Sequence, residues 1–217
     1  PPRSTPKPSS AASDVYKRQL DGRMARTSGR ALPSGRLSPT SAFIGAIACT
    51  LAAAMLLVSG VNCLAAGLSL LGLCSYVLLY TALLKPRTSQ NIVIGGLAGA
   101  LPPLLGWTAV TNQVDGHALL LVLIIFAWTP PHFWALALFR KEDYARANVP
   151  MLPVVAGEME TRRQILIYAV LLAPLAIAPW FVGMASVFYV GLAGAASALF
   201  VYLSWQLFRS GDHAVAR

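Results

Sequence analysis

The chain has 217 residues, of which 56% are hydrophobic and only 12% are charged. A water-soluble domain carries about a quarter charged residues, so this composition, with a mean hydropathy of +0.62, excludes an ordinary soluble protein. The formal net charge of +9 comes mostly from residues 1–40. Such an excess is typical of a cytoplasmic flank in a membrane protein, so we expect no nucleic-acid partner.

The segment before the first apolar run has two parts. Residues 1–19, PPRSTPKPSSAASDVYKRQ, lack periodicity and contain no apolar core of a secretory signal. The stretch SSAASDVYKRQ resembles a translated sequencing-adapter artefact, so we expect residues 1–19 to be non-native and disordered and the true N-terminus to be missing. Residues 21–40 predict a basic, Gly/Pro-punctuated loop.

Six apolar segments follow, each long enough to cross a bilayer. A spanning helix needs ~20 predominantly apolar residues, and an open sheet would leave backbone groups unpaired in lipid. The sequence therefore predicts an all-α, polytopic helical membrane protein. The expected spans are 41–60, 64–84, 91–111, 117–139, 164–183 and 186–208, and the longest connection is 140–163.

Lys and Arg recur in every second connection. They precede the first span, follow the second, separate the fourth from the fifth and follow the sixth, whereas the turns near 61–63, 112–116 and 184–185 contain none. Basic connections stay in the cytoplasm. Both ends of the chain and its polar clusters are therefore predicted on the cytoplasmic face.

Three cysteines, Cys49, Cys63 and Cys74, lie in or beside apolar segments. Their positions lack metal-ligand spacing. We expect them to be small buried hydrophobic residues.

A first candidate site is LLKPRTSQNIVIGG, residues 83–96. Lys85 and Arg87 fall at the membrane surface, and Asn91 opens the third span. Two cations beside a helix N-terminus favour an anion. Simple topology anchors are the alternative for Lys85 and Arg87, and both interpretations remain open.

The fourth span carries the second candidate. Pro130 and Pro131 should interrupt its helical hydrogen bonding, as Pro102 and Pro103 should in the third span. His132, beside the prolines, is an ionisable residue inside a span and hence a functional candidate. The alternative is a neutral histidine that satisfies a kinked backbone. For the neighbouring Trp128, Phe133 and Trp134, core packing is expected over the lining of a pocket.

A run of charges ends the fourth span. Arg140 follows His132 by eight residues, roughly 12 Å along a continuous helix. Glu142 and Asp143, with cations around them, are suited to a divalent cation that bridges to phosphate oxygens. A solvated helix end is the alternative.

The weakest candidate is DGRMARTSGR in the N-terminal loop. The spacing of Asp21, Arg26 and Arg30 suits one wall of an anion or metal site. A basic cytoplasmic flank accounts for the arginines equally well.

Three stretches, NIVIGGLAGALPPLLGW, WTPPHFWALALFRKEDYARANVPMLPVVAG and DGRMARTSGRALPSGRLS, resemble the protohaem IX farnesyltransferase (haem O synthase) family. This family lies within the membrane prenyltransferase superfamily of ubiquinone biosynthesis. The resemblance covers residues 20–217, which are expected to be a partial transmembrane prenyltransferase domain. It implies a bundle of nine helices around a cavity, about six of them present here, and two Asp-rich cytoplasmic motifs for Mg²⁺ and a prenyl diphosphate.

The resemblance also assigns residues. Asp21 matches the last aspartate of the first motif, where KRQ stands in place of the others, and Asp143 matches the second region. Both are implied metal ligands and catalytic residues, and His132 is implied to serve the haem side. The implied substrate-binding residues are Arg26, Arg30, Lys85, Arg87, Asn91, Arg140, Lys141 and Tyr144.

The implied reaction transfers a farnesyl group from farnesyl diphosphate to a vinyl group of haem B and gives haem O for terminal oxidases. The implied setting is a bacterial inner membrane, with haem A synthase or oxidase assembly downstream. Two alternatives remain: an inactive chain that lacks most of one metal motif, and a non-enzymatic multi-pass transporter. A transporter should carry ionisable groups at the midplane of several helices, whereas His132 alone does so here.

Overall fold

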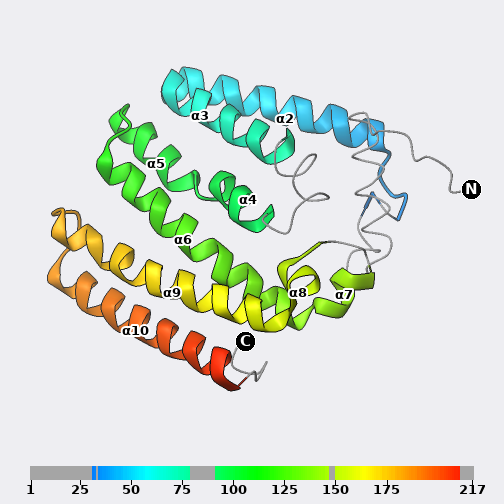
Figure 1. Ribbon diagram of the computed structural model, residues 1–217. Coiled ribbons are helices and arrows are strands. Elements are labelled where there is room, and N and C mark those ends of the chain that lie inside the picture. The colour runs from blue at the N-terminus through cyan, green and yellow to red at the C-terminus, as the bar shows by residue number, and fades with distance from the viewer. Residues whose placement is uncertain (1–30, 33, 79–90, 147–149, 211–217) are drawn as a thin grey trace, which may run out of the picture.

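The computed structural model describes residues 31–32, 34–78, 91–146 and 150–210, and every element in these residues is a helix (Figure 1). The helices are α2 (Pro39–Gly60), α3 (Cys63–Cys74), α4 (Asn91–Gly99), α5 (Pro102–Thr111), α6 (Gly116–Phe139), α7 (Lys141–Arg146), α8 (Leu152–Val155), α9 (Gly157–Phe181) and α10 (Val187–Ser210). The expected all-α class is confirmed.

The long helices lie side by side in one row. Its order is α2, α3, the α4–α5 pair, α6, α9 and α10, with α2 and α10 at opposite edges (Figure 1). Successive passes run in opposite directions. The C-terminal end of α6, the short helices α7 and α8, and the N-terminal end of α9 therefore gather at the same end of the row (Figure 1).

Five of the described helices are long and apolar enough to cross a membrane. They are Pro39–Gly60, Ile92–Thr111, Gly116–Phe139, Gly157–Phe181 and Val187–Ser210. These agree in place with five of the six expected spans. The expected second span, 64–84, corresponds to the shorter apolar helix Cys63–Leu78, beyond which residues 79–90 lie outside the described part. The chain is an integral membrane protein.

The expected fifth span, 164–183, lies within a helix that starts earlier. Helix α9 begins at Gly157, seven residues before the expected apolar span, and its first two turns contain four charged residues. Glu158 pairs with Arg162 at i,i+4, and Glu160 with Arg163 at i,i+3. Such pairs stabilise a helix outside the apolar region. The predicted connection 140–163 is consequently short and largely helical.

The two proline pairs have different effects. Helix α4 ends at Gly99 and α5 begins at Pro102, so the third span is broken as predicted. Helix α6 instead continues through Pro130 and Pro131, both of which are buried. Beside them, the Thr129 hydroxyl donates to the Ile125 carbonyl oxygen at 2.7 Å.

Apolar side chains cover much of the outer surface, as a lipid environment allows. No residue of α2 is buried, although the helix is apolar throughout. Cys49, Cys63 and Cys74 are all exposed, unpaired thiols, so the expectation that they are buried is wrong. They belong to α2 and α3, at the edge of the row where few neighbours cover them (Figure 1).

The larger core cluster lies near the charged end, between α6 and its neighbours. Trp134 is 1% exposed, and its ring meets the Tyr168 ring of α9 edge-on, with centroids 5.4 Å apart. The expected core role holds for Trp134 but is wrong for Trp128 and Phe133, which are 40% and 43% exposed. The buried members of the cluster are Ile92, Trp134, Ala137, Leu138, Met151, Leu152, Ile165 and Leu207.

We predict that Trp134→Ala lowers the free energy of unfolding by about 3 kcal/mol, because it opens a cavity where helices α6 and α9 meet. Thermal unfolding in detergent measures the effect. Trp128→Ala, on the exposed face of the same helix, is the control and should change the midpoint little. Equal effects of the two variants would contradict this account of the core.

Asp115 begins α6 at the end of the row opposite α7. Its carboxylate accepts the Ala118 N–H at 3.0 Å and the Trp107 indole N–H at 3.1 Å. The backbone hydrogen bond from Ala118 is the main reason that the pKa of Asp115 lies below its usual 3.8. Burial opposes this shift, while Trp107 and His117 reinforce it. The charged carboxylate therefore stabilises the start of α6.

Because the pKa of Asp115 is lower in the folded state, its contribution is complete above the usual 3.8 and is lost as the pH falls through the folded value. We expect Asp115→Ala to lower the apparent Tm by a constant amount from neutral pH down to about pH 5. Below the usual pKa the difference from wild type should shrink. A difference that grows in acid would contradict the assignment.

Candidate functional site

The structure describes only part of the predicted site. Asp21, Arg26, Arg30, Lys85 and Arg87 lie outside the described residues. Asn91 is the first residue of α4, and its side chain also lies outside the described part. The predicted site residues whose side chains are described are His132, Arg140, Lys141, Asp143 and Tyr144.

Arg140 marks the turn from α6 into α7. Its backbone leaves the helix, with φ −110° and ψ 21°, and its carbonyl oxygen accepts the Tyr144 N–H at 3.1 Å. Glu142 and Asp143 follow in the first turn of α7, where the helix dipole favours negative charge. Asp143 is exposed. It is therefore open to a ligand from outside the helix row.

A three-residue ion cluster joins α7 to α9. Lys141 Nζ lies 2.9 Å from Glu158 Oε1, and Arg162 Nη2 lies 2.9 Å from Glu158 Oε2. Glu158 thus uses both carboxylate oxygens. Gly157, just before it, has φ +85°, a left-handed conformation that favours glycine at the corner between α8 and α9.

Arg162 is the most enclosed member of this cluster. Its side chain is 12% exposed, against 41% for Lys141 and 32% for Glu158. Its Nε is buried and has no hydrogen-bond partner among the described residues. A guanidinium carries five N–H donors and no acceptor, so Arg162 retains donor capacity beyond its bond to Glu158.

Tyr144 has a structural environment. It is half-buried and packs against the core cluster that contains Trp134. Lys141 and Tyr144 are three residues apart and share one face of α7, the face turned to the body of the protein. Glu142 and Asp143 are exposed. Asp143 therefore lies on the face of α7 that points away from the core.

His132 lies on the exposed side of α6. Its ring stacks on Trp128, with centroids 4.4 Å apart and planes 17° from parallel, and meets Phe133 edge-on at 5.5 Å. Its described contacts are thus aromatic. The continuous α6 leads from these rings to Arg140, so an apolar surface and the charged end of the row are connected along one helix.

The described residues do not by themselves form a metal centre. No group of three or more His, Cys, Asp or Glu side chains within the described ranges is arranged to hold a metal ion. Mg²⁺, however, keeps several waters and binds through one or two carboxylates plus substrate phosphates. One exposed carboxylate, Asp143, fits that mode of binding as a single contributor.

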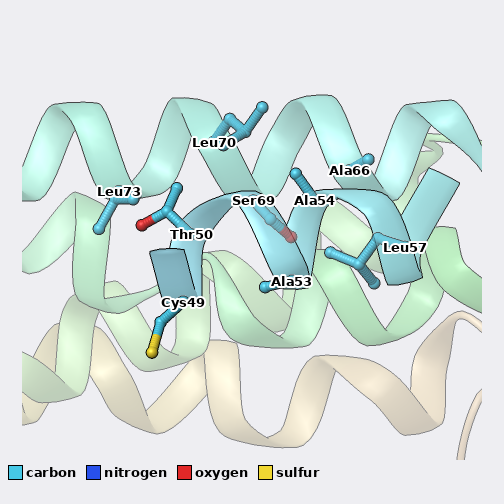
Figure 2. Close-up of a pocket in the computed structure, with 9 residues that line it drawn as sticks. All are labelled: Cys49, Thr50, Ala53, Ala54, Leu57, Ala66, Ser69, Leu70 and Leu73. Atoms are coloured by element: carbon cyan, nitrogen blue, oxygen red, sulfur yellow. The ribbon is translucent and has the colours of Figure 1, made fainter. Parts of the chain in front are cut away.

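Two open cavities lie away from these charges. One, of about 250 Å³, lies between α2 and α3, and Figure 2 shows its small and apolar lining with the Thr50 and Ser69 hydroxyls. The Thr50 hydroxyl is already bonded to the Ala46 carbonyl oxygen at 2.8 Å. The other, of about 460 Å³, lies between α6 and α9 and is lined by apolar residues with Tyr168. Neither contains a charged side chain.

Sequence reasoning identified Lys141 but missed Glu158 and Arg162, which it placed in a connection. Their i,i+4 spacing was a visible signal of a helical pair. The contact of Glu158 with Lys141 joins residues 17 positions apart, which spacing on one helix does not reveal.

Comparison with known proteins gives consistent results. The sequence profile of the UbiA prenyltransferase family matches residues 9–217. The protein named "Protoheme IX farnesyltransferase" from Synechococcus sp. (strain CC9605) is 73% identical over 154 residues, which are 71% of this chain and 47% of that protein. Its namesake from Prochlorococcus marinus (strain MIT 9303) is 68% identical over 151 residues, 70% of this chain and 45% of that protein.

The chain therefore spans about half the length of the curated relatives it matches. A third such relative, from Parasynechococcus marenigrum (strain WH8102), is 73% identical over 70% of this chain and 46% of its own length. No solved structure matches.

We predict that Arg162→Met and Glu158→Gln are non-additive, because each removes the same ion pair. A double-mutant cycle on thermal unfolding should give a coupling of about 1 kcal/mol for this partly buried pair. The matched cycle on Arg163 and Glu160, which are 3.5 Å apart and more exposed, should give a smaller value. A larger coupling in the control cycle would contradict the described packing.

Proposed function

The chain belongs to the UbiA prenyltransferase family, and we propose that it carries the charged end of an enzyme that transfers a farnesyl group to haem B. The observation that carries the proposal is the identity of 64–73% to proteins named protoheme IX farnesyltransferase. The arrangement of the described side chains supports it, since cations and a carboxylate gather at the C-terminal end of α6, a helix that also carries exposed aromatic rings. The product of the proposed reaction is haem O.

The chemistry is an electrophilic alkylation. The bond between farnesyl C1 and the diphosphate oxygen breaks, and the diphosphate leaves with the electron pair. The haem vinyl π electrons form the new bond to C1, which leaves a cation on the former vinyl group. Water adds to that cation and releases a proton, which gives the hydroxyl of haem O.

The cationic residues act on the leaving group. Negative charge grows on the diphosphate as the C–O bond breaks, so fixed positive charges nearby lower the barrier. Arg140 ends α6, and Lys141 and Arg162 lie 2.9 Å from the same carboxylate. Lys85, Arg87, Arg26, Arg30 and Asn91 are proposed to complete the diphosphate site.

The aromatic residues of α6 act on the farnesyl cation and the haem. Trp128, His132 and Phe133 present contiguous, exposed rings. Aromatic faces attract cations, and apolar walls keep water from the allylic cation before the carbon–carbon bond forms. His132, as the titratable ring among them, is proposed to accept the proton released on the haem side.

Asp143, together with Asp21, is proposed to hold Mg²⁺. When bound, Mg²⁺ would neutralise diphosphate oxygens and assist their departure. The protein's own part is to keep the Asp143 carboxylate exposed at the start of α7. Tyr144 is proposed to border the substrate while its ring packs against the core.

The site is proposed to face the cytoplasm of a bacterial inner membrane. The described Lys and Arg residues gather at one end of the helix row, where the chain also carries Arg36 and Arg209, and basic ends remain on the cytoplasmic side. Haem A synthase or oxidase assembly is the proposed consumer of the product. In the described spans, the Asp, Glu, Lys, Arg and His residues other than His132 lie within the first two turns or the last turn of a helix. This distribution disfavours a transporter.

We predict that Asp143→Ala lowers haem O formation by at least about a hundredfold, because the leaving diphosphate loses its metal-mediated stabilisation. Product is measured by chromatography and mass spectrometry after incubation with haem B, farnesyl diphosphate and Mg²⁺. Glu160→Gln, on the neighbouring α9, is the matched control and should retain activity. Full activity of Asp143→Ala in a folded protein would remove Asp143 from the mechanism.

A further inference from the structure

Two described side-chain contacts join helix α7 to the body of the protein. The Tyr144 ring packs against the core cluster, and Lys141 Nζ lies 2.9 Å from Glu158 Oε1 on α9. The helix has only six residues. An isolated helix of this length is unstable in water, so its orientation depends on contacts with the rest of the protein, these two among them.

The outward face of α7 carries Asp143. Because Lys141 and Tyr144 are three residues apart, they fix one face of the helix against the protein, and the opposite face with Glu142 and Asp143 is exposed. A rotation of α7 about its axis would move the Asp143 carboxylate away from its position. The direction of Asp143 therefore depends on the side chain that holds Lys141.

We propose that Glu158 is a positioning residue that holds α7 through Lys141 and thereby orients Asp143 toward a metal–diphosphate group. Glu158 is suited to this part for two reasons. It lies in the first turn of α9, where the helix dipole favours a carboxylate, and its second oxygen is bonded to the enclosed Arg162 at 2.9 Å. The Arg162 bond fixes Glu158, and Glu158 in turn fixes Lys141.

The same geometry defines an opposing possibility. A carboxylate bonded to two cations could instead occupy the place of a diphosphate and compete with it. The two possibilities predict opposite effects of removing the Glu158 charge: a positioning residue makes binding weaker when it is lost, whereas a competitor makes binding tighter. The identity of the ligand in this inference rests on the proposed function, whereas the attachment of α7 does not.

The first measurement reports on the attachment alone. A nitroxide spin label is placed on α7 through Ala145→Cys, an exposed position, in the full chain with Cys49, Cys63 and Cys74 changed to Ala. We expect Glu158→Gln to increase the mobility of the label. Glu158→Asp should restore part of the order, and Glu160→Gln, whose partners are Arg163 and Gln164, should leave the spectrum unchanged.

The second measurement reports on the ligand. Calorimetric titration with inorganic diphosphate in Mg²⁺ is repeated for wild type, Glu158→Gln and Glu160→Gln. We expect Glu158→Gln to weaken Mg²⁺-dependent binding about tenfold, the usual cost of losing a residue that orients a metal ligand. The Glu160→Gln control should bind as wild type does.

The outcomes separate the two proposals. An unchanged spin-label spectrum in Glu158→Gln, or tighter diphosphate binding, overturns the positioning role. A wild-type chain that binds no diphosphate overturns the proposed function and the ligand part of this inference, while the spin-label spectra still decide whether Glu158 holds α7. Increased mobility together with weaker binding supports the inference in full.

Discussion

The constraint on which the structure depends is that a backbone inside a lipid bilayer must satisfy its own hydrogen bonds. The described apolar segments are accordingly all helical, and the polar groups that cannot enter lipid are confined to the helix ends. With successive helices antiparallel, alternate ends meet on one side of the row (Figure 1). A site built from charged residues can therefore form only where those ends meet.

Packing within the row supplies the rigidity that such a site needs. Lipid is as apolar as the helices, so close fit and hydrogen bonds hold helices together more than the hydrophobic effect does. A Cβ atom added at Gly96 of α4 would lie 3.2 Å from Thr129 Cγ2 of α6, which shows how closely these helices approach. Trp134 extends the contact from α6 to α9, next to the turn that carries the charged residues.

Much of the fold was predictable from the sequence, because hydrophobic length and the distribution of Lys and Arg follow directly from the thickness and polarity of a bilayer. The start of α9 was not predictable in this way. The pairing of Glu158 with Arg162 extends the helix into a charged segment, which hydropathy alone assigns to a connection between spans. The exposure of Cys49 depends on which helices surround α2, and a cysteine in an apolar segment suits either a core or a lipid-facing surface.

The candidate site was predictable to a smaller degree. Asp143 and Lys141 were identified by residue type and resemblance, but the part of Glu158 required knowledge of how α7 lies against α9. Tyr144 illustrates the same limit, because its sequence position suggests a substrate contact while its ring packs against the core. Residue type predicts what a side chain can bind, whereas tertiary packing decides where it is presented.

The break between α4 and α5 has a consequence for the shape of the third span. A continuous helix keeps its direction through its own hydrogen bonds, but Pro102 and Pro103 remove the N–H groups that would align the two halves. Both halves contact α6, so a neighbouring helix contributes to the angle between them. A change in the curvature of α6 is therefore expected to bend the third span at this break.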